Sequence, residues 1–219
     1  MSSGNAEKIS ERFLRRLFNE MEKRYRVERE LSRRELSEKH KAPVIFVHEI
    51  LQCPLKQDFS QQFPEIEMAS IYNSKFVVGW LIEEAIKKLT NSREKPCYKI
   101  IDVDGEKYVL AGSMDVFIAE DSTAIEVKYL TSMYGAPHIH HILQLQLYLF
   151  LAGLNHGELW MFSPEGTLFE EVTPLDEDHV KELVRSYVER LNIPRWDWEC
   201  TRCLYEEWCG KSLRKMRKK

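Results

Sequence analysis

The stretch GSMDVFIAEDSTAIEVKYL, residues 112–130, decides the fold. It has the pattern of two strands joined by a polar turn at residues 120–123. Glu126 and Lys128 are two residues apart, so a strand projects both side chains from one face. Asp115 lies on the preceding strand, and the turn allows pairing registers in which it faces either Glu126 or Lys128. We therefore expect these three side chains to form a polar cluster on one face of a sheet.

This cluster has the composition of a site for a hard cation. Two neighbouring carboxylates repel each other, and Mg²⁺ or Mn²⁺ between Asp115 and Glu126 would offset that repulsion. The carbonyl of Val127 could add a ligand, and Lys128 could orient a water or stabilise developing charge. Cross-strand charge pairs on an exposed sheet face are the alternative. The other face of the second strand is apolar and helices should cover the sheet, so we expect buried charges that require a reason.

Helices and strands alternate around this stretch in a pattern typical of an α/β or α+β fold with a central mixed sheet flanked by helices. The predicted helices are residues 6–39, 75–89, 138–154 and a segment from about 176 to 192; the predicted strands are residues 98–103, 107–119, 124–130, 157–164 and 166–174, with a short mixed segment at 44–54. In the first helix we expect one buried face, made by Ile9, Phe13, Leu14, Leu17, Phe18, Met21 and Tyr25. We expect Asp104-Gly105 to form a hairpin turn and Gly112 to mark a weak point or bulge.

Composition places the chain among ordinary globular proteins. Its 219 residues are 43% hydrophobic and 31% charged, with a net charge of −3. That balance excludes wholesale disorder, and no apolar run is long enough to span a membrane. The N-terminus does not resemble a secretory signal, so we expect a cytoplasmic protein. The tail at 211–219 carries six basic residues and no acid, which fits either a solvated terminus or a phosphate-binding arm.

Three of the five cysteines are clustered near the C-terminus. Cys200, Cys203 and Cys209 follow the short spacings of metal ligands. A fourth ligand would come from Cys53, which precedes a proline, or from Cys97. The spacing alone leaves three options open, namely an iron–sulfur cluster, a zinc site or reduced thiols.

The order of polar motifs resembles that of RecB-type nucleases, which have the restriction-endonuclease-like PD-(D/E)XK fold. The family pattern D-x(10)-E-x-K matches Asp115, Glu126 and Lys128, and its Q-x-x-x-Y motif matches Gln144 and Tyr148 on the following helix. Four residues after Gly79 the family usually has a histidine, whereas this chain has Glu83. The resemblance implies a site in which Glu83, Asp115, Glu126 and the Val127 carbonyl hold Mg²⁺ or Mn²⁺.

One branch of these nucleases has a single cysteine before the nuclease core and three after it. Cys53 and the set Cys200, Cys203 and Cys209 match that arrangement. The resemblance implies that the four thiolates form a clasp around an iron–sulfur cluster, [4Fe–4S] being favoured and [2Fe–2S] possible. It divides the chain into an N-terminal helical segment (1–42), a nuclease core (43–199), and a cysteine segment with the basic tail (200–219).

Within this branch the chain resembles the small CRISPR-associated exonucleases. The resemblance implies a metal-dependent DNA exonuclease that acts on single-stranded DNA or DNA ends, processes precursor spacers during CRISPR adaptation beside the integrase proteins, and could form a homo-oligomer. Asp115, Glu126, Lys128, Gln144 and Tyr148 would be its catalytic residues. A DNA-repair nuclease outside CRISPR and a non-cutting module that binds DNA ends are the alternatives. His138, His140 and His141 precede the Gln/Tyr motif, and we prefer substrate-positioning or surface roles for them over a metal site.

Overall fold

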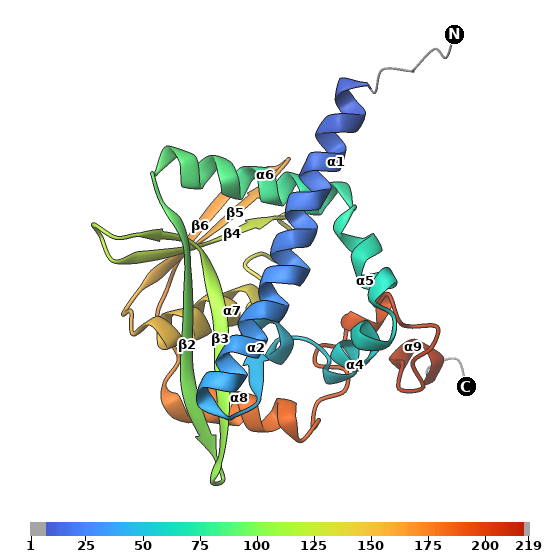
Figure 1. Cartoon of the computed structure of the whole chain (residues 1–219), viewed down its shortest axis with the longest axis vertical. Helices are drawn as coiled ribbons and strands as arrows, with labels where there is room; N and C mark the ends of the chain where they lie inside the picture. Colours follow the sequence, from blue (N-terminus) through green and yellow to red (C-terminus); the bar gives the residue numbers. More distant parts are fainter. Residues whose placement is uncertain (1–7, 217–219) are drawn as a thin grey trace.

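A mixed six-stranded sheet holds the motif-bearing strands at its centre (Figure 1). The protein was analysed as a computed structural model that describes residues 8–216, apart from the side chains of residues 70, 71 and 216. The strands are β1 (Val44–Phe46), β2 (Arg93–Val103), β3 (Glu106–Ile118), β4 (Thr123–Tyr129), β5 (Gly157–Ser163) and β6 (Gly166–Val172). Their order is β1-β3-β4-β5-β6, and β2 also pairs with β3. The pairs β1–β3 and β4–β5 are parallel and the others antiparallel, so the prediction of a mixed sheet is confirmed.

Helices cover both faces of this sheet. They are α1 (Ile9–Glu22), α2 (Arg29–His40), α3 (Val47–Ile50), α4 (Pro54–Gln62), α5 (Pro64–Ile71), α6 (Ser74–Leu89), α7 (Ile139–Ala152), α8 (Glu177–Val188) and α9 (Leu213–Met216), with a π-helical turn at Lys23–Glu28 and a 3-10 turn at Glu199–Thr201. Helix α6 packs on β4 from one side, and α7 packs on the sheet from the other. None of the described helices is long and apolar enough to cross a membrane.

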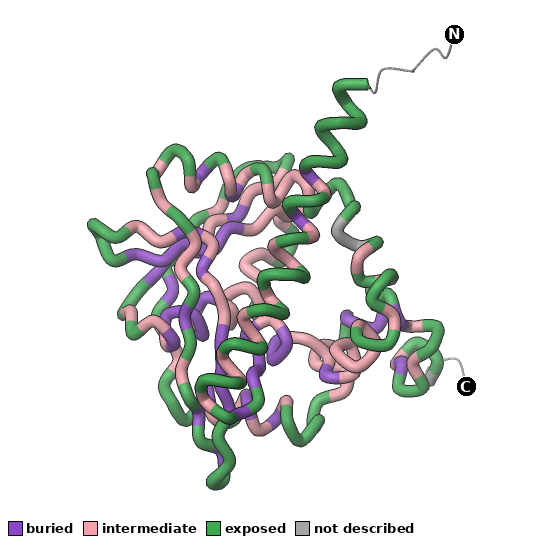
Figure 2. Tube along the Cα trace, in the orientation of Figure 1, coloured by how far each residue is buried: buried purple, intermediate pink, exposed green. Residues whose placement is uncertain are grey.

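Alternate side chains of β4 point to opposite faces of the sheet, so this strand contributes to two hydrophobic cores. Ile125 and Val127 pack with Ile86 of α6, whereas Ala124 faces the main core with Leu145 of α7. Because successive side chains of a strand point to opposite faces, Glu126 shares the α7 face. The central strands are accordingly the most buried part of the trace in Figure 2.

Residues 9–40 form one continuous helical rod, here called the N-terminal rod, which crosses in front of β3 in Figure 1. The predicted long helix is therefore confirmed, but its predicted buried face is only partly correct. Leu17 and Met21 are buried, whereas Ile9, Phe13 and Leu14 are 78%, 55% and 44% exposed. The first turns project beyond the core, as Figure 2 shows, so the described residues cover their apolar side chains only in part.

Two helices between residues 54 and 71 are missing from the sequence prediction. Pro54 was expected to end a segment, but it opens α4, and Pro64 opens α5. Proline is well suited to the first turn of a helix, where its missing N–H would have no partner. The Asp104-Gly105 turn is confirmed, since both residues adopt positive φ angles of 54° and 88°.

Candidate active site

Asp115 lies at a β-bulge in β3. Met114 pairs with Lys95 of β2, but Phe117 pairs with Arg93, so β3 has one more residue than β2 over this interval. A bulge bends a strand and redirects the side chains that it contains. The predicted weak point at Gly112 is therefore wrong in position, since the irregularity comes just after it and includes Asp115 itself.

The pairing of β3 with β4 brings Asp115 to the motif of the next strand. Val116 pairs with Ile125, and continuing that antiparallel register by one residue sets Asp115 opposite Glu126. This is one of the two registers expected from the sequence. The Val127 amide donates a hydrogen bond to the Asp115 carboxylate at 3.0 Å, which fixes the side chain against β4.

Two carboxylates and one ammonium group thus meet in a largely buried place. Glu126 is only 1% exposed, and its Oε2 has no hydrogen-bond partner among the described residues, while Oε1 accepts from the Lys128 ammonium. Burial and the carboxylates of Glu126 and Glu83 hold the pKa of Asp115 well above its usual range, although Lys128 opposes them. Burial also raises the pKa of Glu126. Burial would lower the pKa of Lys128, but Glu126 and Asp115 outweigh it and raise that pKa.

Gln144 and Tyr148 lie one helical turn apart on α7, and the Gln144 amide donates to the Tyr148 hydroxyl at 3.1 Å. Burial and the charges of Glu126 and Asp115 raise the pKa of Tyr148 well above its usual range, so the phenol stays protonated beside the carboxylates. Gly112 makes this approach possible. A Cβ atom there would lie 2.4 Å from Cε1 of the Tyr148 ring, closer than carbon atoms can approach.

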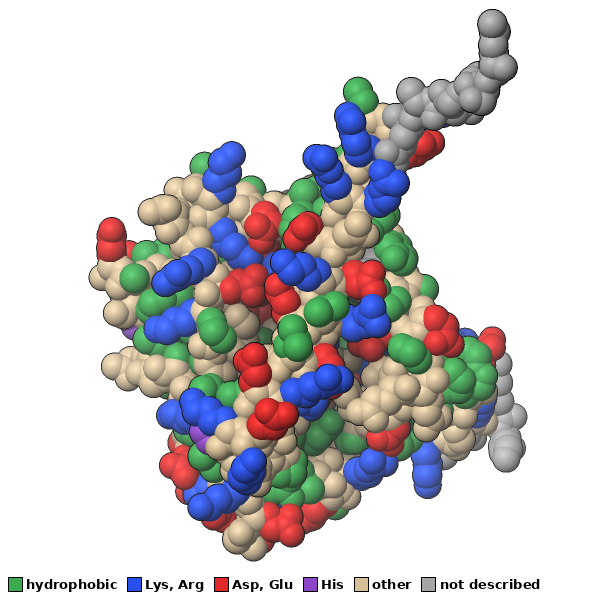
Figure 3. All heavy atoms as spheres, in the orientation of Figure 1, with side chains coloured by type: hydrophobic (Ala, Val, Ile, Leu, Met, Phe, Trp, Pro, Cys, Tyr) green, Lys and Arg blue, Asp and Glu red, His purple; other side chains and the backbone are tan. Residues whose placement is uncertain are grey.

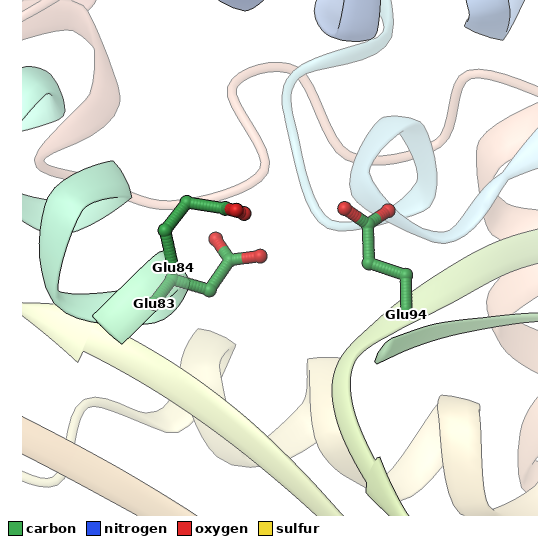
Figure 4. A group of neighbouring side chains, drawn as sticks. All are labelled: Glu83, Glu84 and Glu94. Atoms are coloured by element: carbon green, nitrogen blue, oxygen red, sulfur yellow. The ribbon is translucent and has the colours of Figure 1, made fainter. Parts of the chain in front are cut away.

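Glu83 reaches the site from α6 but already has cationic partners. Its carboxylate forms ion pairs with Arg24 of the N-terminal rod and with Lys87, the second at 2.8 Å. Glu84 and Glu94 point to the same place (Figure 4), and the carboxylates of the three glutamates lie within 4.8 Å of one another. Arg24 also binds Glu94 at 2.7 Å. Glu83 is thus both a neighbour of Asp115 and an anchor for the rod.

The four cysteines of the proposed clasp come from both ends of the core. Cys53 precedes α4, and α4 packs against the C-terminal segment in Figure 1. There the Phe59 and Tyr205 rings stack with centroids 5.5 Å apart. Burial raises the pKa of Cys53 to about 11, and the nearby groups of Glu199, Cys209 and Cys203 add to the shift. Cys97 carries a free thiol on β2, 3.7 Å from the Gly112 carbonyl, and its pKa is raised by burial to about 12.

Glu199 ties the two ends together. Its buried carboxylate accepts hydrogen bonds from the amide of Cys53 and the amide of Trp196, each at 3.0 Å. The Trp196 indole adds a bond to the Leu51 carbonyl at 2.9 Å. The Glu199–Cys53 and Trp196–Leu51 bonds join residues 146 and 145 apart in the sequence. A sequence pattern does not show them, because a glutamate bound to a distant amide looks like any other glutamate.

The three histidines cluster at the N-terminus of α7. The rings of His140 and His141 have centroids 4.1 Å apart, and His138 lies within 5.6 Å of both. Burial lowers the pKa of His140 to about 4 and that of His141 to about 2, so both are neutral at pH 7. Trp198 lies 5.1 Å from the His140 ring and is 43% exposed.

The described part of the basic tail folds back onto the cysteine segment. Lys215 donates to the Glu207 carbonyl at 2.6 Å. Residues 217–219, which carry three of the six basic groups, lie outside the described residues.

Comparison with known proteins identifies relatives of this chain. The CRISPR-associated exonuclease Cas4 of Saccharolobus solfataricus is 30% identical over 178 residues, which cover 77% of this chain and 88% of that protein. The chain belongs to the Cas4 family. The crystal structure of SSO0001 is similar to this Cas4 homologue with a TM-score of 0.74 and 28% identity, over 78% of this chain and 87% of that chain.

A second structural similarity is much weaker. The alkaline exonuclease LHK-Exo from Laribacter hongkongensis has a TM-score of 0.41 and 14% identity, over 67% of this chain and 85% of that one, which is too low to support an argument about the Cas4 site. No protein-family model matches the chain.

Proposed function

We propose that this Cas4 homologue is a metal-dependent DNA exonuclease whose site is built on Asp115 and Glu126. The observation that carries the proposal is the buried carboxylate pair, in which one oxygen of Glu126 has no partner among the described residues. Burying two like charges is costly unless a cation compensates them. The Lys128 ammonium compensates one of the two negative charges, and a bound metal cation would compensate the other.

The donor set fits Mg²⁺ or Mn²⁺. Asp115, Glu126 and the Val127 carbonyl supply the hard oxygen ligands that both ions prefer. Glu83 would join them only by exchanging its contact with Arg24 or Lys87 for one with the metal. When bound, such an ion supplies a Lewis acid for the phosphodiester and lowers the pKa of a nucleophilic water.

The remaining side chains have roles that follow from their charge and position. Lys128, whose raised pKa keeps it cationic, stabilises negative charge on the attacked phosphate. The protonated Tyr148 hydroxyl and the Gln144 amide donate hydrogen bonds that position the DNA strand.

The four cysteines fit an iron–sulfur cluster that closes the molecule. All are free thiols, and they come from segments that Glu199 already holds together. Joining residues so far apart in sequence removes entropy from the unfolded chain, so cluster binding would add to the stability of the fold. Iron, sulfide and zinc analysis of an anaerobic preparation tests this, and a colourless protein with one zinc would contradict it.

The family relationship supports a role in CRISPR adaptation. There the enzyme would trim precursor spacers beside the integrase proteins, acting on single-stranded DNA or DNA ends. A DNA-repair role and a non-cutting role remain the competing functions, and the chemistry of the site favours cutting over binding alone.

Linear and circular single-stranded DNA distinguish these activities. With Mn²⁺ or Mg²⁺ we expect the protein to release mononucleotides from the linear form and to leave the circular form intact. Binding of both forms without release of nucleotides, under conditions where the metal is bound, would indicate the non-cutting module instead.

A further inference from the structure

The N-terminal rod presents three side chains toward the nuclease site. Arg24, Tyr25 and Arg29 lie in or beside the π-helical turn, and each is at least partly buried. π-helical turns recur at functional sites because they change the direction of side chains within a helix. Figure 3 shows basic side chains gathered near the start of the rod and a mixture of basic and acidic side chains along the rest of its visible face.

Arg29 differs from its basic neighbours because its charge is not held in an ion pair with any described residue. The neighbouring cations are all held in ion pairs, namely Arg24 with Glu83, Arg33 with Glu49, and Lys128 with Glu126. Arg33 also donates a hydrogen bond to the Val44 carbonyl. The guanidinium of Arg29 forms no hydrogen bond or ion pair with any residue from 8 to 216 that the structure describes. A partly buried arginine in that situation is well suited to an external anion.

Tyr25 supports the Arg29 guanidinium and connects it to the site. Its ring lies between two guanidinium groups, with centroid distances of 5.8 Å to Arg24 and 5.9 Å to Arg29. Burial raises the pKa of Tyr25, and the charges of Arg24 and Glu83, and then of Asp115 and Lys128, also act on it, so this ring shares the electrostatic neighbourhood of the site. The ionisation of Tyr148 in turn affects the pKa of Arg29, so the two groups belong to one electrostatic neighbourhood.

We propose that Arg29, supported by Tyr25, binds a phosphate of the DNA strand beside the Asp115–Glu126 carboxylates. The N-terminal rod is then part of the substrate site, held in place by the Arg24–Glu83 ion pair. The inference rests on the proposed nuclease function and adds a residue that recognises the strand next to the cleaved bond. Burial lowers the pKa of Arg29, and the carboxylates of Glu67 and Glu49 oppose that shift and favour the cationic guanidinium.

Binding of a fluorescein-labelled single-stranded oligonucleotide, measured by anisotropy with Ca²⁺ in place of the catalytic metal, tests the proposal. For Arg29→Gln we expect the Kd to rise about tenfold, and the slope of log K against log salt concentration to fall by about 0.7, the value for one phosphate contact on a single strand. Arg29→Lys keeps the charge and should retain most of that slope. The matched control is Arg26→Gln, since Arg26 is exposed on the same turn and pairs with Glu22 at 2.5 Å. This variant should bind like the wild type.

The outcomes separate this proposal from the one on which it rests. If the wild type binds and degrades the oligonucleotide and Arg29→Gln has the same Kd and salt slope, the Arg29 site is wrong and the nuclease stands. If the wild type neither binds nor degrades DNA, the proposed function itself is wrong, and the Arg29 site with it. A loss of binding in Arg29→Gln without a change in salt slope would indicate a structural effect and would also contradict the phosphate site.

Discussion

At the residue scale, the charge of Asp115 is the most unfavourable feature of the metal-free site. Its raised pKa shows that the folded protein resists ionisation of this carboxyl, and the causes are burial and the carboxylates of Glu126 and Glu83. The Val127 amide and Lys128 offset only part of that cost. A function that needs a cation at this point accounts for a charge that stability alone would not retain.

Removing that charge should stabilise the protein when no metal is present. In Asp115→Asn the amide oxygen can still accept the Val127 hydrogen bond, while the repulsion with Glu126 disappears. We expect the free energy of unfolding in EDTA to rise by about 1 kcal/mol, the usual size of a single-substitution effect, because the repulsion between the two carboxylates is removed. Urea unfolding measures this. We expect added Mn²⁺ to stabilise the wild type and to have no such effect on the variant. A variant less stable than the wild type in EDTA would argue against the repulsive pair.

The lowered pKa values of His140 and His141 predict that the stability of the fold decreases as the pH falls. The raised pKa of Asp115 acts in the opposite direction. Their folded pKa values, about 4 for His140 and about 2 for His141, lie below the ordinary 6.5. Between pH 6.5 and 4 these histidines therefore bind protons in the unfolded chain but not in the folded one. Their contribution to stability is complete above pH 6.5 and is lost as the pH falls toward 4. His141→Gln should flatten this dependence by at most about 1.4 kcal/mol per pH unit. Urea unfolding at pH 5, 6 and 7 measures the slope, and an unchanged slope would contradict the burial of neutral His141.

At the scale of the element, the contact between β3 and α7 depends on one missing side chain. Gly112→Ala places a Cβ against Tyr148, so we expect a loss of about 1–3 kcal/mol in stability and a larger loss of nuclease activity, because the ring must move. Gly79→Ala is the control. Its Cβ would meet the Tyr129 Cβ at an ordinary 3.5 Å, and alanine favours the interior of α6. Equal effects of the two substitutions would show that Tyr148 does not need Gly112.

The connection between α4 and the C-terminal segment depends on Glu199. Glu199→Ala leaves the amides of Cys53 and Trp196 without their acceptor, which should cost about 3 kcal/mol. If the clasp holds a cluster, the iron content of the purified protein should fall as well. The exposed Glu207→Ala serves as control. Wild-type stability and iron content in Glu199→Ala would show that Glu199 does not hold the two ends together.

At the scale of the whole molecule, local periodicity predicts the strands β2 to β6, whereas β1 falls in the segment at 44–54 that was described only as mixed. The period of two predicts that Glu126 and Lys128 share a face, and the motif order led to Gln144 and Tyr148 on α7. Periodicity could not reveal the bulge at Asp115, since a bulge depends on how two strands pair.

Contacts between segments far apart in the sequence could not be predicted from local patterns either. The ion pair of Arg24 with Glu83 joins residues 59 apart, and the Glu199–Cys53 bond joins residues 146 apart. The N-terminal rod had no assigned role for the same reason, because its position over the site follows from these long-range contacts.

The most direct test of the central claim is the rate at which mononucleotides are released from end-labelled linear single-stranded DNA in Mn²⁺. The comparison is between the wild type and Asp115→Asn, with folding of both confirmed by thermal unfolding. We predict that the wild type releases nucleotides and that the rate of the variant is lower by at least about 10³-fold, as for loss of a group that acts on the reacting phosphate. A folded Asp115→Asn variant with the wild-type rate would contradict the assignment of the active site.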